Sequence, residues 1–282
     1  MDNRAIGVFD SGLGGLTVSR AILELLPSER IVYFGDTARV PYGSKSNAAV
    51  LRFSEENTRF LLGKNIKCMV IACNTATAIA LPRLRQDFSL PILGVIEAGA
   101  RRAAEATKNG RIGVIGTVRT IASGAYSAAI HACGARMEVH EKACPLLVPL
   151  IEEGWLEHEA TRLIVREYLD PLAALGIDTL ILGCTHYPLL ANLIRSCYPD
   201  ICPVDSASST AEALKSLLTE QGLLADPVGS GCASGSGGVS EGITVWVSDY
   251  SETFHKVAEE ILQSPLDGVI FTACADEFGT DR

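Results

Sequence analysis

Two stretches of the sequence share one pattern and decide how the rest of the chain is read. Residues 180–188 read LILGCTHYP, and residues 69–77 read MVIACNTAT. In each, a short apolar run leads to a cysteine, which is followed by polar residues and a segment with helical spacing. We therefore expect Cys73 and Cys184 each to lie where a buried strand ends and a helix begins. In open α/β sheets, this edge is where ligands bind.

A helix that begins beside a cysteine has a chemical consequence. Its free backbone N–H groups and its partial positive charge favour a thiolate or a bound carboxylate. A free thiol has a pKa of about 8.5, and such surroundings lower this pKa toward neutrality. Either cysteine would then be a workable general base near neutral pH. The alternative is that both thiols only pack beneath their helices. Their equivalent places in the two halves of the chain favour the chemical role.

The two cysteine stretches belong to an internal repeat. Residues 112–117 (IGVIGT) echo residues 6–11 (IGVFDS) at an offset of 106, and the two cysteines lie 111 residues apart. Residues 201–204 echo residues 92–95 at an offset of 109. Ordered anchors at a nearly constant offset indicate two similar halves. The repeat therefore predicts that the two strand ends are structurally equivalent.

The order of elements predicts the fold class. Strands alternate with helices in each half, which is typical of an α/β protein with mostly parallel sheets and helices on both faces. We expect two similar, doubly wound, flavodoxin-like lobes related by a pseudo-twofold axis. The site would lie in the cleft between them, with the two thiols on opposite sides of one ligand. A base on each face of one carbon is what inversion of a stereocentre requires.

The last part of the chain departs from the repeat. A helix is expected over residues 206–218, a flexible Gly/Ser-rich loop over 226–242, a strand over 243–248 and a helix over 251–262. Because the second half is complete by Val204, this tail is expected to pack on the first lobe. The predicted first lobe is then discontinuous, with residues 1–97 plus 207–282. Residues 98–206 form the predicted second lobe.

Composition excludes several classes of function. The chain has 282 residues, is 48% hydrophobic and carries a net charge of −9, which argues against nonspecific nucleic-acid binding. No apolar run approaches the roughly 20 residues that a membrane helix needs, and no secretory signal opens the sequence. Nine cysteines without pairing logic indicate reduced thiols and a cytoplasmic protein. No close Cys or His pair has metal-ligand spacing, so no metal is expected.

Two further carboxylate-bearing turns have simpler interpretations. A glycine-rich turn at residues 11–15 follows the first strand and its terminal Asp10, but its spacing matches neither the dinucleotide fingerprint nor the P-loop. Asp36 ends the second predicted strand, and we expect it to cap a turn rather than to touch a ligand.

Taken together, the motifs resemble those of the cofactor-independent aspartate/glutamate racemase family. The resemblance extends from Ile6 to Val204 and does not cover the tail. It implies the interconversion of L- and D-glutamate with no cofactor, and no lysine lies in a context that suggests a Schiff base. The matching segments are residues 6–15 (IGVFDSGLGG), 35–36 (GD) with 41–43 (PYG), 72–77 (ACNTAT), 149–154 (PLIEEG) and 183–188 (GCTHYP).

The resemblance also implies roles for individual residues. Cys73 and Cys184 would be the two acid/base residues, and Glu152 with His186 would be auxiliary groups near the second cysteine. Glu152 could equally be an ordinary surface carboxylate. Hydroxyls and helix-start N–H groups suit the carboxylates of glutamate, and the carboxylate of Asp10 suits its ammonium. The residues implied to bind substrate or to assist the cysteines are Asp10, Ser11, Tyr42, Gly43, Asn74, Thr75, Thr185 and His186.

Alternatives remain at this point. Another racemase of the family, acting on aspartate or a related acid, would share these motifs, because pocket shape decides side-chain length. A two-lobed small-molecule binding protein would share the architecture, but the paired cysteines and the missing export signal argue against it. The resemblance further implies supply of D-glutamate for peptidoglycan, and a homodimer is possible. Because the first motif begins near residue 6, we expect no dependence on a cell-wall precursor through an N-terminal extension.

Overall fold

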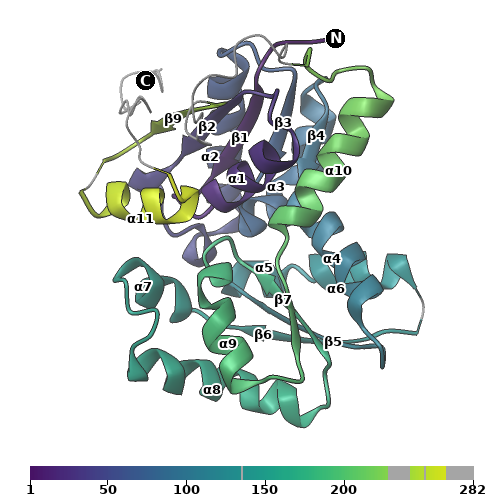
Figure 1. The fold of residues 1–282 in the computed structure, drawn as a ribbon, viewed down its shortest axis with the longest axis vertical. Coiled ribbons are helices and arrows are strands. Elements are labelled where there is room, and N and C mark those ends of the chain that lie inside the picture. Colours follow the sequence, from purple (N-terminus) through teal and green to yellow (C-terminus); the bar gives the residue numbers. More distant parts are fainter. Residues whose placement is uncertain (135, 228–241, 251, 265–282) are drawn as a thin grey trace.

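The chain folds into two lobes, each built on one parallel β-sheet with helices on both faces (Figure 1). The computed structural model describes residues 1–134, 136–227, 242–250 and 252–264. The predicted fold class is confirmed, since both sheets are parallel and interleaved with helices. Within the described residues, no helix is long and apolar enough to cross a membrane.

The first lobe contains a five-stranded sheet in the order β4-β3-β1-β2-β9. Strand β1 is buried along its whole length, as expected for a parallel strand covered on both faces. Its alternate residues pack into separate clusters, with Ile6 and Val8 on one face and Phe9 on the other. The elements of this lobe before the crossover are β1 (Ile6–Asp10), α1 (Leu16–Leu25), β2 (Ile31–Gly35), η1 (Thr37–Arg39), η2 (Tyr42–Ser44), α2 (Asn47–Leu62), β3 (Cys68–Ile71), α3 (Asn74–Asp87) and β4 (Ile92–Gly94).

The second lobe contains a four-stranded sheet in the order β6-β5-β7-β8. Read from its other edge, this order is that of β4-β3-β1-β2, so the sequence repeat is a repeat of topology. Helix α4 packs on this second sheet, where Ile96 joins the cluster of Ile112 and Val114. The elements of this part are α4 (Val95–Ala106), β5 (Arg111–Gly116), α5 (Val118–Ala122), α6 (Ala125–Cys133), β6 (Glu138–Ala143), α7 (Leu147–Glu152), α8 (Glu159–Ala174), β7 (Thr179–Gly183), η3 (Tyr187–Leu190), α9 (Ala191–Cys197) and β8 (Cys202–Val204).

The tail returns to the first lobe (Figure 1). Strand β9 (Ile243–Val247) pairs in parallel with β2, and helix α10 (Ala207–Glu220) packs in the same core cluster as α1. Helix α11 (Glu252–Leu262) also contributes to this cluster. On this packing we propose the division into residues 1–97 plus 207–282 and residues 98–206, with the first boundary falling inside α4. Most of the Gly/Ser-rich stretch 226–242 lies outside the described residues.

A buried ion pair ties the tail to the edge of the first sheet opposite the cysteines. Lys67 Nζ lies 2.6 Å from Glu29 Oε2, and both side chains are almost fully buried. Lys67 also donates to the carbonyls of Asp2 (2.8 Å) and Leu223 (2.7 Å), while Glu29 Oε1 accepts from the Ala225 N–H at 2.9 Å. Each charge is therefore paired and hydrogen-bonded, which is what its burial requires. The network holds the N-terminus and the segment after α10 together.

Candidate active site

The carboxyl ends of the two sheets meet at a cavity between the lobes. Its volume is about 310 Å³ including its mouth, and both Cys73 and Cys184 line it. Most of the side chains expected at the site are brought together here, but Asp10 and Glu152 are not among the lining residues. The lining residues are Ser11, Val40, Pro41, Tyr42, Gly43, Cys73, Asn74, Thr75, Thr117, Val148, Cys184, Thr185 and His186.

Cys73 stands at a strand end followed directly by a helix, as the sequence predicts. It is the N-cap residue of α3, and its Sγ accepts a hydrogen bond from the Ala76 N–H at 3.5 Å. The Ser11 hydroxyl lies 3.7 Å from the same sulfur. Burial, with the nearby Asp10 carboxylate, nevertheless raises the pKa of Cys73 to about 12, because the Ala76 and Ser11 contacts offset only part of this effect. The expected lowering of the Cys73 pKa is therefore wrong.

Cys184 follows β7 directly, but no α-helix begins beside it. A turn leads into the 3₁₀ helix η3, and α9 starts only at Ala191. The prediction of a helix start at this cysteine is therefore wrong. Pro188 sits in the first turn of η3, a place where its missing N–H and fixed φ are tolerated. The second thiol has no helix terminus beside it.

An imidazole and a carboxylate take the place of the helix terminus at Cys184. Its Sγ lies 3.8 Å from His186 Nδ1, and His186 Nε2 lies 3.3 Å from Glu152 Oε1. Burial on its own lowers the pKa of His186, but the contacts with Cys184 and Glu152 outweigh it and raise this pKa to about 10. The imidazole is therefore protonated on both ring nitrogens and positively charged at neutral pH, and it lies within reach of the thiol.

Asp10 lies behind the cavity rather than in it. Its side chain is fully buried, accepts the Gly12 N–H at 3.1 Å through Oδ2, and accepts the Thr185 hydroxyl at 3.4 Å through Oδ1. The latter bond joins the first lobe to the second. Burial raises the pKa of Asp10, while the neighbouring His186 charge and backbone N–H groups act against that rise. Asp10 can therefore act on the cysteine and on Thr185 from behind.

Polar groups that follow Cys73 make contacts across the two lobes. Asn74 Oδ1 accepts the Tyr126 hydroxyl at 2.5 Å, whereas its buried Nδ2 has no hydrogen-bond partner among the described residues. The Thr75 hydroxyl lies 2.8 Å from that of Thr117 and 3.2 Å from that of Thr120. An amide donor without a partner is costly when buried, so Asn74 is prepared for an acceptor on a ligand.

Sequence reasoning missed three of these residues, namely Thr117, Thr120 and Tyr126. A signal for Thr117 was present, because it is the repeat equivalent of Ser11 in the echo between residues 112–117 and 6–11. No comparable signal marks Thr120 and Tyr126, whose helices α5 and α6 meet the first lobe only in the folded molecule.

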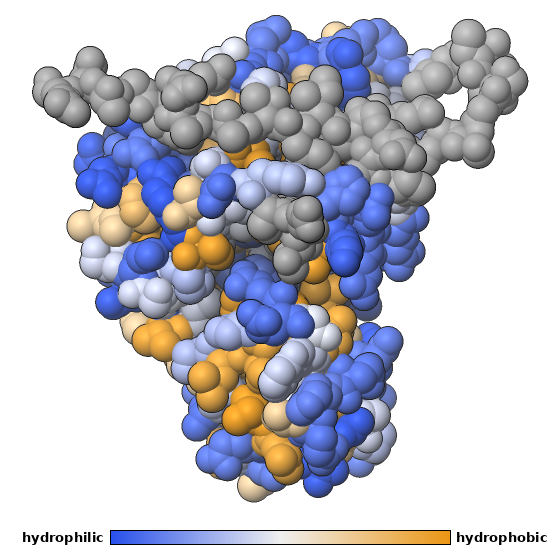
Figure 2. Space-filling model, turned by 90° about the vertical axis from the view of Figure 1, so that its left-hand side faces the viewer, coloured by the Kyte–Doolittle hydropathy of each residue, from blue (hydrophilic) through white to orange (hydrophobic). Residues whose placement is uncertain are grey.

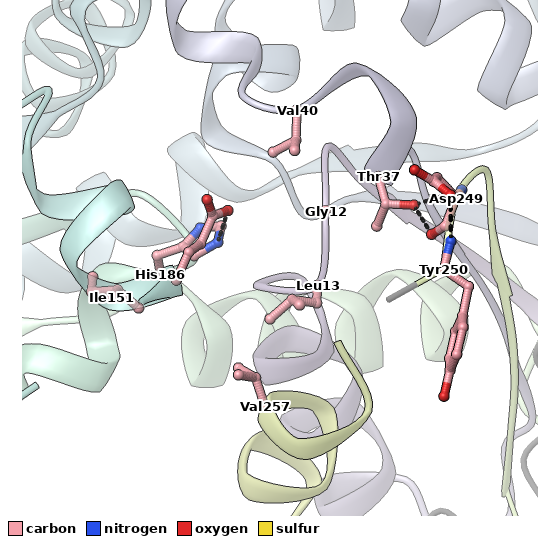
Figure 3. Close-up of a pocket in the computed structure, with 10 residues that line it drawn as sticks. Gly12, Leu13, Thr37, Val40, Ile151, His186, Asp249, Tyr250 and Val257 are labelled. Carbon is pink, nitrogen blue, oxygen red and sulfur yellow. Dashed lines mark hydrogen bonds and ion pairs between the residues drawn. The ribbon is translucent and has the colours of Figure 1, made fainter. Parts of the chain in front are cut away.

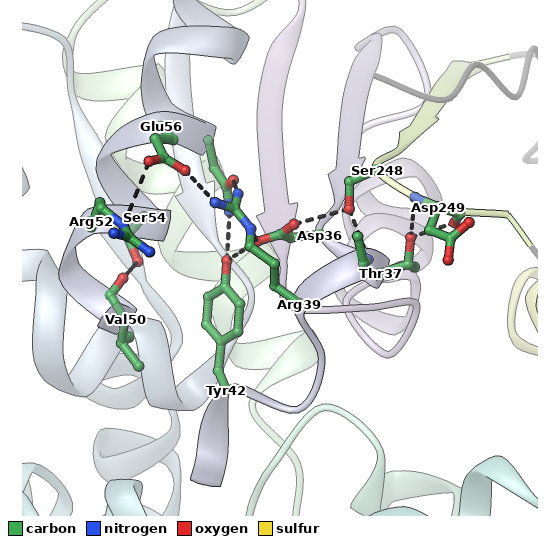
Figure 4. A network of polar contacts seen from close by, with 12 residues as sticks. Asp36, Thr37, Arg39, Tyr42, Val50, Arg52, Ser54, Glu56, Ser248 and Asp249 are labelled. Atoms are coloured by element: carbon green, nitrogen blue, oxygen red, sulfur yellow. Dashed lines mark hydrogen bonds and ion pairs between the residues drawn. The ribbon is translucent and has the colours of Figure 1, made fainter. Parts of the chain in front are cut away.

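The loop with Tyr42 and Gly43 forms the first-lobe wall. The Tyr42 hydroxyl points away from the cavity, donating to Asp36 and accepting from Asn57 at 3.0 Å (Figure 4). Asp36 also accepts from Arg39 at 2.6 Å. The expectation that the Asp36 side chain caps a turn is therefore wrong, because it makes no capping bond and anchors this network instead.

Gly43 has a steric role at the same wall. A Cβ atom on this residue would lie 2.5 Å from the Thr117 Cβ of the other lobe, closer than real Cβ contacts come. Glycine therefore allows the two lobes to approach each other closely at this point.

Glu152 lines a second cavity, which we call the side cavity and which adjoins the first at His186. Its volume is about 750 Å³ including its mouth. Figure 3 shows His186 with a carboxylate beside it on one side of the space and Thr37 with Asp249 across from them. The residues that line the side cavity are Gly12, Leu13, Thr37, Val40, Ile151, Glu152, His186, Asp249, Tyr250 and Val257. In the part of the chain that the structure describes, no group of three His, Cys, Asp or Glu residues could hold a metal ion.

Comparison with known proteins shows the class to which this fold and site belong. Residues 6–214 match the family model described as Asp/Glu/Hydantoin racemase, and the chain belongs to this family. The family expected from the sequence motifs is thereby confirmed.

Individual relatives narrow the class further. The chain is 49% identical to the glutamate racemase of Neisseria gonorrhoeae over 267 residues, which are 94% of this chain and 95% of that protein. It is similar to the crystal structure of a glutamate racemase isoform from Bacillus anthracis, with a TM-score of 0.87 and 38% identity. The match covers 96% of this chain and 97% of that one. A Francisella tularensis glutamate racemase in complex with D-glutamate gives a TM-score of 0.85 at 36% identity, covering 96% and 97%. The chain is an isomerase of the racemase class.

Proposed function

We propose that this protein interconverts L- and D-glutamate with two thiols acting from opposite faces of the α-carbon. The observation that carries the proposal is the pair of cysteines. They end equivalent strands of two lobes with the same topology, and they line one cavity. A pair of general acid/base groups on two sides of one carbon is what inversion at that carbon needs.

The family resemblance assigns Cys184 to L-glutamate and Cys73 to D-glutamate. With L-glutamate, Cys184 as a thiolate takes the α-proton, so that the C–H bond breaks and an S–H bond forms. Cys73 then delivers its own proton to the other face of the carbanion and becomes the thiolate. The raised pKa of Cys73, about 12, keeps this thiol protonated at neutral pH, as an acid must be. With D-glutamate the steps run in reverse, from the state in which Cys73 is the thiolate and Cys184 carries the proton.

The other groups of the site hold the substrate and adjust the thiols. The unpartnered Asn74 Nδ2 and the hydroxyls of Ser11, Thr75 and Thr185 suit the two carboxylates of glutamate. His186 and Glu152 assist Cys184. Asp10 does not line the cavity, so we propose that it acts through Cys73 and Thr185 rather than by direct contact with the ammonium.

The choice of glutamate rests on relatives. The N. gonorrhoeae relative is named glutamate racemase, and the F. tularensis relative is in complex with D-glutamate. The test is α-proton exchange in deuterated water with glutamate and with aspartate, followed by NMR. We expect deuterium at Cα and loss of optical rotation with glutamate and little of either with aspartate. Faster exchange with aspartate would make aspartate the substrate. No exchange with either amino acid would contradict the proposed reaction and favour a small-molecule binding protein.

Three wider features are part of the same proposal. They are supply of D-glutamate for peptidoglycan, action in the cytoplasm without a cofactor, and a homodimer. The last has one surface feature in its favour. Leu146, Trp155 and Leu163 of the second lobe are large apolar residues that are 45–60% exposed. Figure 2 shows hydrophobic residues interspersed with hydrophilic ones on the lower half of one face, which belongs to this lobe.

A further inference from the structure

We propose that the side cavity is a water-filled path through which the Cys184 thiol exchanges its proton with solvent while substrate is bound, and that Cys73 has no such path. This inference rests on the proposed racemisation. It concerns the step after proton abstraction, when each thiol must regain its starting state.

The first observation is the row of groups that leads from Cys184 to the side cavity. His186 lines both cavities, and its two ring nitrogens lie 3.8 Å from the Cys184 sulfur and 3.3 Å from Glu152 Oε1. The His186 side chain is 3% exposed, whereas that of Glu152 is 38% exposed. The row therefore begins at a buried thiol and ends at a carboxylate that water reaches.

The second observation concerns water itself. His186 Nε2 is buried and has no well-aligned hydrogen-bond partner among the described residues, although Glu152 is close. A buried ring nitrogen in this state accommodates a water molecule, provided that there is space. The side cavity has a volume of about 750 Å³ including its mouth, and a water in the liquid takes about 30 Å³, so several waters fit beside the Glu152 carboxylate.

The surroundings of Cys73 differ in this respect. Its described hydrogen-bond contacts are Ser11 Oγ at 3.7 Å and the Ala76 N–H at 3.5 Å. Its charged neighbour Asp10 is fully buried, and Ser11 is 8% exposed. In the described part of the chain, no partly exposed imidazole or carboxylate follows Cys73 as His186 and Glu152 follow Cys184. The Cys73 thiol therefore exchanges its proton with solvent only when the cleft between the lobes opens.

The chemistry makes this difference measurable. After Cys184 takes the α-proton of L-glutamate, the carbanion either receives a proton from Cys73 or recovers one from Cys184. If the Cys184 proton has exchanged with deuterated water in the meantime, the recovered L-glutamate carries deuterium with its configuration retained. The same event at Cys73 returns the original proton to D-glutamate. One proton is taken and one hydron is returned in each case, so the exchange is balanced.

The experiment uses the full chain in deuterated water at early times. L- and D-glutamate are supplied separately, the enantiomers are separated by chiral chromatography, and α-deuterium in the unconverted substrate is measured by mass spectrometry. We expect retained-configuration exchange to be several-fold faster for L-glutamate than for D-glutamate. Equal exchange for both, or faster exchange for D-glutamate, would overturn the inference.

A variant that narrows the side cavity tests the proposed proton path. Val257 of α11 lines the side cavity (Figure 3) and is not among the residues that line the cavity with the two thiols. Val257→Phe narrows the space and should slow the retained-configuration exchange of L-glutamate while inversion continues. Val257→Ala, the matched control, widens the space and should keep that exchange. Unchanged exchange in a folded Val257→Phe protein contradicts the path. Absence of both exchange and inversion in the wild type contradicts instead the proposed function.

Discussion

The surroundings of Cys73 and Cys184 differ more than their positions do. Both thiols follow equivalent strands, β3 and β7, and both are buried, with exposures of 5% and 7%. Yet Cys73 caps an α-helix beside a buried carboxylate, whereas Cys184 meets an imidazole that leads to a carboxylate at the surface. The repeat thus determines the position of each cysteine in its lobe. The residues that follow each cysteine determine the electrostatic surroundings of its thiol.

The asymmetry has a thermodynamic limit. The two enantiomers of glutamate have the same free energy in solution, so kcat/KM must be equal in the two directions for any variant. A substitution near only one of the two cysteines therefore changes kcat/KM by the same factor for L- and for D-glutamate. The asymmetry becomes visible only in half-reactions, in proton exchange and in the stability of the protein.

Replacing one thiol tests the comparison most strongly. In Cys73→Ser and Cys184→Ser the side chain keeps its shape, but a hydroxyl is far less acidic than a thiol. Racemisation should fall by about 10²–10⁴-fold in each variant, the range that a general acid/base group contributes. Circular dichroism of the enantiomers measures this loss directly.

A half-reaction then assigns each thiol to an enantiomer. A glutamate analogue with a leaving group on the β-carbon needs only removal of the α-proton, after which the electron pair expels that group. Cys73→Ser should still eliminate from the L analogue through Cys184, and Cys184→Ser from the D analogue through Cys73. If one variant eliminates from both enantiomers of the analogue at equal rates, a single base is at work and the two-thiol mechanism is wrong.

Much of this comparison was accessible from the sequence. The strand ends at Ile71 and Gly183 were predicted to within one residue, because parallel strands covered on both faces are continuous apolar runs. The place of β9 and α10 on the first lobe followed from the repeat being complete at Val204. These features are local patterns or counts, which the order of residues records.

The rest depends on long-range packing. Asp36 bonds to Ser248, 212 residues away, and Tyr126 bonds to Asn74, 52 residues away. No local pattern reports such contacts. The raised pKa of Cys73 comes mainly from burial, which outweighs the helix terminus that the sequence does reveal. At Cys184 the chain enters the 3₁₀ helix η3 instead of the expected α-helix, which no local pattern announces.

The charge on His186 gives a third test, which concerns the Cys184 side of the site. Its pKa in the folded protein is about 10, against an ordinary value of 6.5. A group whose pKa is raised by folding stabilises the protein fully below the unfolded value, and this contribution is lost as pH rises through the folded value. The stability advantage of wild type over His186→Asn should therefore be constant below about pH 6.5 and shrink up to about pH 10.

Urea unfolding at several pH values measures this advantage, which should be on the order of a few kcal/mol at its largest. Glu152→Gln is the matched variant, because it keeps the imidazole and removes one of the groups that raise its pKa. Its pH window should end lower than that of wild type. An advantage that does not change between pH 6 and 10 would mean that His186 is neutral in the folded protein.

The smallest expected effect separates the two thiols by their role in helix capping. Cys73 Sγ accepts the Ala76 N–H at the start of α3, whereas no α-helix starts at Cys184. Loss of a side-chain cap costs about 0.5–2 kcal/mol, and serine is itself a good cap. Cys73→Ala should therefore be less stable than Cys73→Ser by about 1 kcal/mol, while Cys184→Ala and Cys184→Ser should differ by much less. The comparison of alanine with serine at each position cancels most of the volume lost with the sulfur, since the two replacements are similar in size. Urea midpoints of the four variants give the two differences, and equal differences at both positions would show that the Ala76 contact contributes nothing to capping.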